Sequence, residues 1–340
     1  MKINIFSRGK LSFNPFTEKN VGVGSTETTI VNVAEKLSEN KHDVTVYCNC
    51  NFPDIYNGVR YYQSYDYKLS GEDALICFGA MPKYTDAKSV FVWSTKIDEL
   101  SSINNFNYSL YEIKNLIVSS EWHRDRFASE LQGNLLQKMK VIELGVSKEF
   151  LEFNKDKWPL SITYAGPPQK GGMEAMIEFA KRIKPKNKDI LIYVYGGGHL
   201  WGWDNEQYRK LYDDLIRNRI FYQGQKGKRR LVKQLGSSQI FLYPTRKSYH
   251  SAFGLGILEA MASKCVVVAN NSGNIKNLVK DSGYIIDENI EDYKWAIEAM
   301  DIVLKLFEDK ELMLEKQEKA REYAKDFTWG RTVDKFLELI

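Results

Sequence analysis

The sequence has few of the residues that hold secreted or metal-stabilised folds together. Its 340 residues include only four cysteines and four histidines. The cysteines are Cys48, Cys50, Cys77 and Cys265, and their spacing matches neither a disulfide framework nor a zinc pattern. No two histidines have the spacing of metal ligands. These scarcities predict a protein of a reducing, cytoplasmic compartment that binds no metal.

Long hydrophobic runs and a strong charge of one sign are also missing. No apolar run approaches the roughly 20 residues that a membrane span needs, and the segment from Met1 to Phe6 begins directly as a strand without a basic leader. Lys and Arg number 48 against 44 Asp and Glu, which leaves a net charge of +4. That excess is too small to predict nucleic acid as a partner. We therefore expect a soluble protein, with peripheral membrane contact left open.

What the sequence does contain is two series of short apolar runs with helical patterns between them. The first series comprises Ile3 to Phe6, Val44 to Cys48, Ala74 to Phe78, Val90 to Trp93, Leu116 to Val118 and Lys140 to Ile142. The second comprises Ile162 to Ala165, Ile190 to Tyr195, Ile220 to Gln223, Ile240 to Tyr243, Cys265 to Ala269 and Tyr284 to Ile286. Strands that alternate with helices indicate parallel sheets covered on both faces. The fold class is therefore α/β, with two doubly wound, Rossmann-like domains.

The chain is long enough for two domains, each with its own core. The segment from Lys148 to Trp158 is rich in charged and aromatic residues, and Pro159 then breaks the pattern. We therefore predict a first domain over residues 1–155, a second over 156–325, and a final helix over 326–340. In such folds ligands bind beyond the carboxyl ends of the strands, so we expect the two domains to face each other across one cleft.

The stretch most informative about function lies between Tyr243 and Asn274. It passes through Phe253-Gly254-Leu255 into a short apolar helix and then into a strand. Because Gly254 has no side chain, the free N–H groups of the first helical turn can approach an anion, and the helix dipole attracts a phosphate. Glu259, one turn further on, can accept hydrogen bonds from a sugar diol. The plainer interpretation is a helix cap followed by a tolerated, partly buried glutamate.

The segment 251–260, Ser-Ala-Phe-Gly-Leu-Gly-Ile-Leu-Glu-Ala, resembles the donor-site motif of GT-B glycosyltransferases. Its closest resemblance is to retaining family 4, in which the motif usually reads Glu-Gly-Phe-Gly-Leu-x-x-Leu-Glu-Ala. The resemblance implies that Glu259 holds the ribose hydroxyls and that the amides around Gly254 and Leu255 hold the diphosphate. It also implies that Ser251, which replaces the first Glu of the motif, touches the transferred sugar. His250 beside it is the histidine expected in the cleft, in contact with the sugar, although an exposed loop residue explains it equally.

A second resemblance follows the strand that ends at Ala165. There the chain reads Gly166-Pro-Pro-Gln-Lys170-Gly171, whereas the family usually has Gly-Arg and then Lys-Gly. Lys170 matches the diphosphate lysine, but proline stands where the arginine is expected. Without a metal, fixed positive groups must stabilise the charge that develops on the leaving diphosphate. Arg246 or Lys247 either replaces the missing arginine or is a solvated loop charge.

Three further segments resemble the family. Gly24 and Ser25 stand in a Gly-rich entry to a helix that resembles a Gly-Gly-Ser-Glu-Thr segment near the diphosphate and acceptor, although N-capping by Ser25 or Thr26 explains that segment as well. Gly196 begins a match to a Gly-x-Gly loop. Gln223 or Gln225 is expected to read the base. The basic run Lys226, Lys228, Arg229 and Arg230 is interpreted either as a solvated helix start or as a surface for an acidic acceptor or anionic lipid.

The residues that these resemblances imply fall into two groups. The expected donor-binding residues are Gly24, Ser25, Gly166, Gly171, Gly196, Gln223, Phe253, Gly254, Leu255 and Glu259. The expected catalytic residues are Lys170, Glu259, Ser251 and His250. The resemblance, which spans nearly the full chain, also implies that the last helix crosses back to the first domain.

The function implied is that of a retaining, metal-independent glycosyltransferase. It would move a sugar from a UDP- or GDP-sugar to a hydroxyl of a glycan or lipid-linked glycan, with no cofactor and with the departing phosphate taking the acceptor proton. One alternative is a nucleotide-sugar-binding protein without activity, because Ser251 and Pro167 depart from the motif and residues 92–96 lack a histidine that the family often has there. Another is an epimerase or phosphorylase on the same scaffold, although phosphorylases of this architecture are usually larger.

Overall fold

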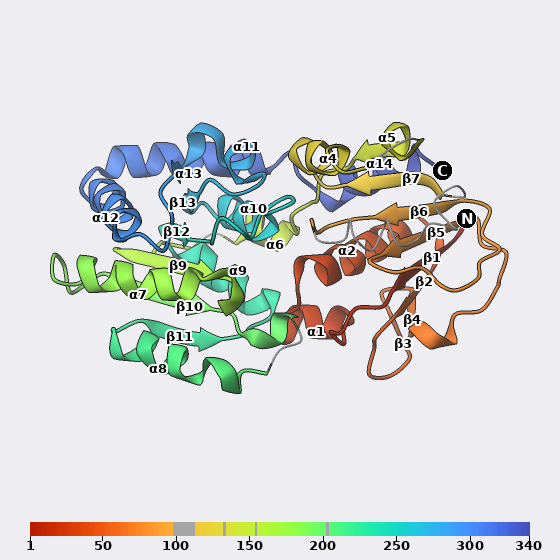
Figure 1. Ribbon diagram of the computed structural model, residues 1–340, viewed down its shortest axis with the longest axis horizontal. Helices are drawn as coiled ribbons and strands as arrows, with labels where there is room; N and C mark the ends of the chain where they lie inside the picture. Colours follow the sequence, from red (N-terminus) through yellow and green to blue (C-terminus); the bar gives the residue numbers. More distant parts are fainter. Residues whose placement is uncertain (98–112, 132–133, 154, 202–203) are drawn as a thin grey trace. The chain divides into compact units, whose positions relative to one another are not determined.

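The computed structural model describes residues 1–97, 113–131, 134–153, 155–201 and 204–340, which form two compact units. Unit 1 comprises Met1–Lys19, Val23–Gly145 and Phe327–Ile340. Unit 2 comprises Asn20–Gly22 and Val146–Asp326. Each unit contains one sheet with helices packed on it (Figure 1), as the sequence predicts.

Within its described residues, unit 1 has an eight-stranded sheet with the strand order β3-β4-β2-β1-β5-β6-β7-β8. The strands are β1 (Lys2–Ser7), β2 (Asp43–Cys48), β3 (Asp54–Tyr56), β4 (Val59–Gln63), β5 (Ala74–Phe78), β6 (Val90–Trp93), β7 (Ile113–Val118) and β8 (Met139–Val141). Neighbouring strands pair in parallel except for β3 and β4. All six predicted strands of this series are present, and the central strands β5 and β6 are apolar runs that the sheet buries on both faces.

The helices of unit 1 cover the two faces of this sheet. They are α1 (Pro15–Asn20), α2 (Ser25–Glu39), α4 (Glu121–Ala128), α5 (Asn134–Lys138) and α14 (Trp329–Leu337), with a short 3₁₀ helix, η1 (Ser64–Asp66). On one face α14 contacts α2, and the ring of Phe336 lies 5.1 Å from that of Phe91 and 5.8 Å from that of Trp93. On the other, Phe127 of α4 joins a cluster with Phe6 and other buried residues. The predicted return of the last helix to the first domain is confirmed.

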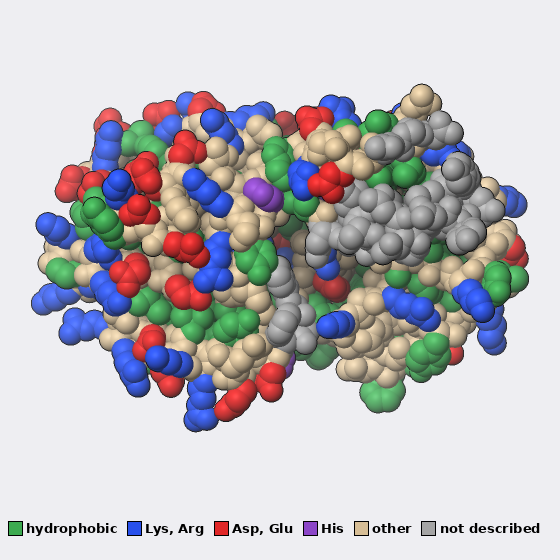
Figure 2. Space-filling model, in the orientation of Figure 1, with side chains coloured by type: hydrophobic (Ala, Val, Ile, Leu, Met, Phe, Trp, Pro, Cys, Tyr) green, Lys and Arg blue, Asp and Glu red, His purple; other side chains and the backbone are tan. Residues whose placement is uncertain are grey.

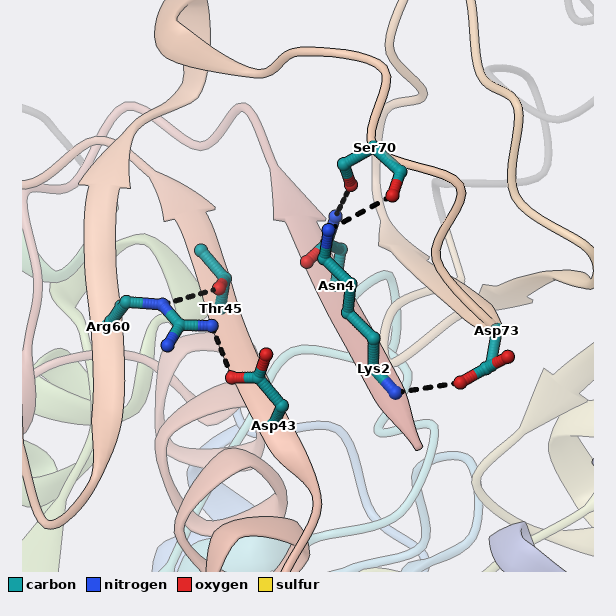
Figure 3. A network of polar contacts seen from close by, with 7 residues as sticks. All are labelled: Lys2, Asn4, Asp43, Thr45, Arg60, Ser70 and Asp73. Carbon is teal, nitrogen blue, oxygen red and sulfur yellow. Dashed lines mark hydrogen bonds and ion pairs between the residues drawn. The ribbon is translucent and has the colours of Figure 1, made fainter.

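The β3–β4 hairpin is an element that the strand pattern did not predict. Its turn is Asn57-Gly58, with φ of 49° and 79°, and this dipeptide is the strongest short signal for a two-residue hairpin turn. The hairpin is held against β2 by Arg60, which donates to the hydroxyl of Thr45 (3.1 Å) and pairs with the carboxylate of Asp43 (Figure 3). The second strand of the hairpin thus extends the sheet past β2.

Within its described residues, unit 2 has a six-stranded sheet, ordered β11-β10-β9-β12-β13-β14 and parallel throughout. The strands are β9 (Ser161–Ala165), β10 (Leu191–Tyr195), β11 (Phe221–Gly224), β12 (Ile240–Tyr243), β13 (Val266–Asn270) and β14 (Tyr284–Ile286). Each lies within one or two residues of its predicted run. The second predicted domain core is therefore confirmed as well.

Helices cover both faces of the unit 2 sheet. The helices are α6 (Lys148–Glu152), α7 (Gly172–Ile183), α8 (Arg209–Arg217), α9 (Lys228–Ser237), α10 (Leu255–Ala262), α11 (Ile275–Val279), α12 (Tyr293–Glu308) and α13 (Lys310–Ala324), with 3₁₀ turns η2 (Pro168–Lys170), η3 (Gly198–Trp201), η4 (Glu206–Tyr208) and η5 (Lys280–Ser282). Tyr222 stacks on Tyr212 of α8 at 4.5 Å. Tyr195, which points to the opposite face, donates to Gln234 of α9 at 2.8 Å. The sheet is thus doubly wound.

The two units divide after Gly145 rather than after the predicted residue 155. The reason is α6, which contacts α9 and α10 of unit 2. The carbonyl oxygen of Leu151 in α6 also accepts a hydrogen bond from Arg321 of α13. Charge and aromatic content marked the right region of the chain, but these packing contacts assign residues 146–155 to the second unit.

The structure also shows how apolar helices, cysteines and charged side chains are distributed. In the part of the chain that the structure describes, no helix combines the length and the apolar character needed to cross a membrane. The four cysteines are buried and none forms a disulfide. Figure 2 shows acidic and basic side chains interspersed over the visible face, in keeping with the small net charge.

A histidine in α4 is fully buried in unit 1. The backbone N–H of Ser119 donates to Nδ1 of His123 at 3.2 Å, and the histidine ring lies 4.4 Å from the ring of Phe127. Burial lowers the pKa of His123 from 6.5 to about 4, because an imidazolium cannot be solvated there. The folded chain therefore holds this histidine neutral.

This buried histidine predicts an acid-sensitive stability. Between pH 6.5 and about pH 4 the unfolded chain binds a proton that folded His123 does not, so the free energy of unfolding falls as the pH falls through this window and levels off below it. The expected loss from this group is about 3 kcal/mol. Denaturant unfolding at pH 7.5 and pH 4.5 should show that His123→Asn loses less stability on acidification than the wild type. Substitution of exposed His199 by Asn is the control, and equal losses in the wild type and His123→Asn would contradict the prediction.

Candidate functional site

The strand order of unit 2 indicates where a ligand binds. From β9 the chain first adds β10 on one side, whereas β12 lies on the other side of β9, so the connections diverge between β9 and β12. In open parallel sheets, ligands bind beyond the carboxyl ends of the strands at such a point. The segments that follow these strands are residues 166–171 and 244–254. Both were predicted site segments.

Lys170, at the end of η2, supplies a positive charge at this edge. Its ammonium donates to the hydroxyl of Tyr243, the last residue of β12, at 3.0 Å, and it lies 5.7 Å from the centre of that ring. Lys170 is half-buried. Among the described residues, no carboxylate lies within ion-pair distance of it. The charge of Lys170 is therefore held in place without being neutralised.

Arg246 lies directly beside Lys170. Its backbone N–H donates to the carbonyl oxygen of Lys170 at 2.9 Å, and its side chain lies against Gly171, where a Cβ would come within 2.6 Å of the Arg246 Nε. The guanidinium pairs with Glu174 (3.8 Å) and Glu291 (3.2 Å), whose side chains are 47% and 62% exposed. Such exposed pairs are weak. Of the two cations considered from the sequence, Arg246 is anchored at the site, whereas Lys247 is exposed.

The amino end of α10 presents backbone amides at the same edge. Gly254 caps the helix with φ of 105° and ψ of 43° and without a side-chain hydrogen bond. A Cβ at this residue would lie 3.1 Å from Leu278. The first N–H groups of a helix have no partner within it, and a Cβ at Gly256 would meet no atom within 4 Å. The amides of Leu255 and Gly256 are the groups expected to bind a diphosphate, and that role stays a prediction.

The loop before α10 is fixed to the end of β13. Ser251 forms a β-bridge with Gly273, and its carbonyl oxygen accepts from the backbone N–H of Asn274 at 2.9 Å. The Asn274 side chain donates to the carbonyl oxygen of Phe253 at 3.1 Å. The Phe253 side chain is buried in the core, so only its backbone is available to a ligand. Ser251 is half-buried at this edge, and His250 is exposed beside it.

Glu259 is buried in α10 and paired with Lys228. The carboxylate oxygen Oε1 contacts the ammonium of Lys228, and the two side chains are only 6% and 16% exposed. The sequence interpretation of Lys228 as a solvated charge is therefore wrong, although Arg229 and Arg230 of the same basic run are exposed. No sequence signal linked the two residues, since they are 31 positions apart. The pairing explains why an acid is tolerated in an otherwise apolar helix.

The predicted glycines at 166 and 196 pack on each other. A Cβ at Gly196, where φ is 122°, would lie 2.0 Å from the carbonyl oxygen of Gly166. Gly196 N–H donates to the carbonyl oxygen of Gly224 at 3.0 Å. Contacts between the loops after β9, β10 and β11 therefore account for glycine at these positions. Gln223 is half-buried at the end of β11, and Gln225 donates to the carbonyl oxygen of Gly22 at 2.6 Å.

Gly24 and Ser25 belong to unit 1, where they begin α2. The N-cap is Gly24, without a side-chain hydrogen bond, so N-capping by Ser25 or Thr26 is wrong. Thr26 instead shares a hydrogen bond of 2.6 Å with Thr95. The Glu27 carboxyl is buried, which raises its pKa, while the N–H of Gly24 and the charge of Lys96 act against that shift. A donor contact through Gly24 and Ser25 stays a prediction.

The described residues contain no group of three or more His, Cys, Asp or Glu side chains placed to hold a metal ion. The chemistry that this edge of unit 2 offers is electrostatic: two cations, a row of amides, and a buried carboxylate with its own counter-ion.

The chain resembles a known protein family and individual known proteins. A family model described as glycosyl transferases group 1 matches residues 148–327, more than half of the chain. The chain is similar to an uncharacterized glycosyltransferase, MJ1178, of Methanocaldococcus jannaschii, with 24% identity over 234 residues. That match covers 67% of this chain and 59% of the relative, so the chain spans less than two thirds of the relative's length.

Solved structures resemble the whole chain. WaaG, a glycosyltransferase involved in lipopolysaccharide biosynthesis, has a TM-score of 0.73 at 14% identity and covers 100% of this chain and 99% of its own. Sucrose-phosphate synthase from Thermosynechococcus elongatus has a TM-score of 0.79 at 13% identity, covering 100% and 98%. HepE of Anabaena, solved with UDP-glucose, has a TM-score of 0.70 at 14% identity, covering 98% of each chain. At these identities the likeness establishes the fold, and the predicted GT-B architecture is confirmed.

The backbone at Gly254 generates a prediction about stability. Gly254→Ala should lower the free energy of unfolding by about 1–3 kcal/mol, because alanine is strained at positive φ and its Cβ would press on Leu278. Gly256→Ala is the matched control, since it lies two residues on in the helix with open space around it, and it should change stability by less than about 1 kcal/mol. Urea unfolding of both variants measures the difference. Equal effects would show that Gly254 is not conformationally required.

Proposed function

Because the chain belongs to the family of glycosyl transferases group 1, we propose that it transfers a sugar from a nucleotide-sugar donor to an acceptor hydroxyl. The observation that carries this proposal is the arrangement at the carboxyl ends of β9 and β12. There Lys170, which has no carboxylate partner among the described residues, follows β9. The loop after β12 leads into α10, with its first-turn amides and buried Glu259. Cations, amides and a carboxylate are what a diphosphate joined to a pentose requires.

The leaving diphosphate is the group that most needs stabilisation. As the glycosidic bond breaks, negative charge develops on the phosphate oxygens, and preorganised donors lower the barrier more than mobile ones do. Lys170 is held by Tyr243 and Arg246 by Gly171 and two carboxylates, so both cations are positioned before a ligand arrives. In the proposal, Lys170 and the α10 amides bind the diphosphate, and Arg246 supplies the charge that Pro167 cannot.

The remaining donor groups follow from the motif. Glu259 would accept hydrogen bonds from the pentose, and Ser251 and His250 would lie by the transferred sugar. Gln225 has an amide oxygen that is buried without a hydrogen-bond partner among the described residues, which fits an N–H of the base. We propose UDP as the first donor nucleotide to try, since the similar HepE was solved with UDP-glucose.

The course of the reaction is proposed from the family resemblance. Transfer would retain the anomeric configuration without a metal, with the departing phosphate taking the proton of the acceptor hydroxyl. A glycan or lipid-linked glycan is the proposed acceptor, and a lipid-linked one would bring the chain to a membrane surface. The second candidate function is a nucleotide-sugar binder without turnover, which Ser251 in place of the motif Glu favours.

The first test removes the two groups at the centre of the proposal. Lys170→Ala and Glu259→Ala should each weaken nucleotide-sugar binding about 10- to 100-fold, the worth of one hydrogen bond to a charged group, and should abolish transfer. Calorimetry with UDP-glucose and GDP-mannose, and release of the nucleoside diphosphate, measure the two effects. Exposed Lys188→Ala and Glu308→Ala are controls. Unchanged affinity in both variants would reject the site, and tight binding without turnover in the wild type would identify a binder.

The second test asks whether Arg246 replaces the missing arginine. Arg246→Ala should lower kcat/KM about 100-fold, a loss typical of one donor to a developing charge, whereas Lys247→Ala, the adjacent exposed cation, should leave it unchanged. The same donor and acceptor are used for both variants. Equal losses of kcat/KM in the two variants would show that the effect comes from positive charge in general rather than from Arg246. No loss in Arg246→Ala would show that Lys170 and the amides bind the diphosphate without it.

A further inference from the structure

The ion pair between Lys228 and Glu259 is unusually well buried for a contact at the edge of a sheet. The side chains are 16% and 6% exposed. Lys228 is the first residue of α9, which begins just beyond the end of β11, and its ammonium lies 5.9 Å from the ring of Phe150. Burying two charges costs about as much as their attraction returns. A pair of this kind is therefore weak evidence of a purely stabilising role.

The free hydrogen-bonding capacity of the pair defines its ligand. Oε1 of Glu259 is occupied by Lys228, while Oε2 has no hydrogen-bond partner in the described part of the chain. The Lys228 ammonium has three N–H donors, and Glu259 is the hydrogen-bond partner that the structure gives it. An anion is repelled by the carboxylate and a cation by the ammonium. Neutral hydroxyl groups, which both donate and accept, match an acceptor and a donor lying side by side.

We propose that Lys228 and Glu259 together read a vicinal diol of the donor's pentose, with Lys228 as a specificity-determining residue. The 3′-hydroxyl donates to Oε2 of Glu259, and the oxygen of the neighbouring 2′-hydroxyl accepts an N–H from Lys228. This inference rests on the proposed function, but it adds a residue that lies outside the motif and has its own helix. A pentose that lacks one hydroxyl leaves Lys228 with an unpaired, partly buried donor, and sites built in this way reject the deoxy analogue strongly.

The experiment compares ribose with 2′-deoxyribose. Calorimetry with UDP, GDP and ADP first identifies the nucleoside diphosphate that the wild type binds most tightly, and its 2′-deoxy form is then measured alongside it. The wild type should bind the deoxy form about 10- to 100-fold more weakly, the range for a hydrogen bond to a charged group. In Lys228→Met the two forms should differ by less than about 3-fold. Lys233→Met, an exposed lysine of the same helix, should keep the wild-type ratio.

Two further variants lack the Glu259 carboxylate, so that an unpaired buried charge does not affect the ratio of ribose to deoxyribose binding. Lys228→Met leaves the Glu259 carboxylate without its counter-ion, so the ratio is also measured in Glu259→Gln and in the double variant Lys228→Met/Glu259→Gln. The proposal predicts that the deoxy penalty is smaller in the double variant than in Glu259→Gln, because only the latter keeps the Lys228 donor. Thermal unfolding confirms that each protein is folded.

The outcomes separate this inference from the proposed function. If the wild type binds none of the three nucleoside diphosphates, the proposed function fails and the inference with it. If the wild type binds one, but Lys228→Met weakens the ribose and deoxyribose forms equally, the nucleotide site stands and Lys228 acts only through charge. An equal deoxy penalty in Glu259→Gln and the double variant overturns the inference in the same way.

Discussion

The burial of Glu259 in α10 is the constraint on which the site of unit 2 depends. An acid placed in an apolar helix needs a counter-ion, and removal of one partner from a buried pair costs about 3–5 kcal/mol. Lys228 meets this need from the first turn of α9, so the relative placement of α9 and α10 is tied to one electrostatic contact. The contact with Lys228 then fixes the orientation of the carboxylate in an otherwise apolar helix.

The rest of the site is built largely from backbone. Gly171, Gly254 and Gly273 all have positive φ, and a Cβ at each would press on Arg246, Leu278 or the backbone of Ser251. These glycines let the loops after β9, β12 and β13 approach each other closely enough to share hydrogen bonds. The resulting surface consists of fixed amides and two anchored cations. Such a surface suits a ligand whose charge changes during reaction, because the dipoles need not reorganise.

The sequence predicted the regular elements of both units well because most strands are short apolar runs, and central ones such as β5 and β13 are buried on both faces. The hairpin of β3 and β4 escaped this pattern, since β3 has only three residues and is exposed or half-buried, although the Asn57-Gly58 turn signalled it. The unit boundary was misplaced because α6 is joined to unit 2 by packing, which composition does not reveal. Local sequence patterns therefore predicted most strands, but not the packing between segments that lie far apart in the chain.

The sequence did not predict contacts between charged residues and partners that lie far away in the chain. Lys228 looked like one charge in a basic run because its partner lies in another helix. Arg246 and Lys247 are adjacent cations with the same composition signal, and only the close approach of Gly171 distinguishes them. Lys170, by contrast, stands in a motif that follows β9, and Gly254 and Glu259 stand in one that follows β12. Their roles at a donor site stay predictions.

The departures from the motif are related through the strand order. β9 and β12 are hydrogen-bonded neighbours and run parallel, so the loops that follow them begin side by side. The backbone N–H of Arg246 in one loop donates to the carbonyl oxygen of Lys170 in the other. On the proposed function, Arg246 would therefore supply the charge that Pro167 cannot. Ser251 differs in chemistry from the glutamate that the motif usually has, because a hydroxyl both donates and accepts hydrogen bonds whereas a carboxylate only accepts them. On the proposed function, this exchange alters which sugar hydroxyls are recognised while leaving the diphosphate site intact.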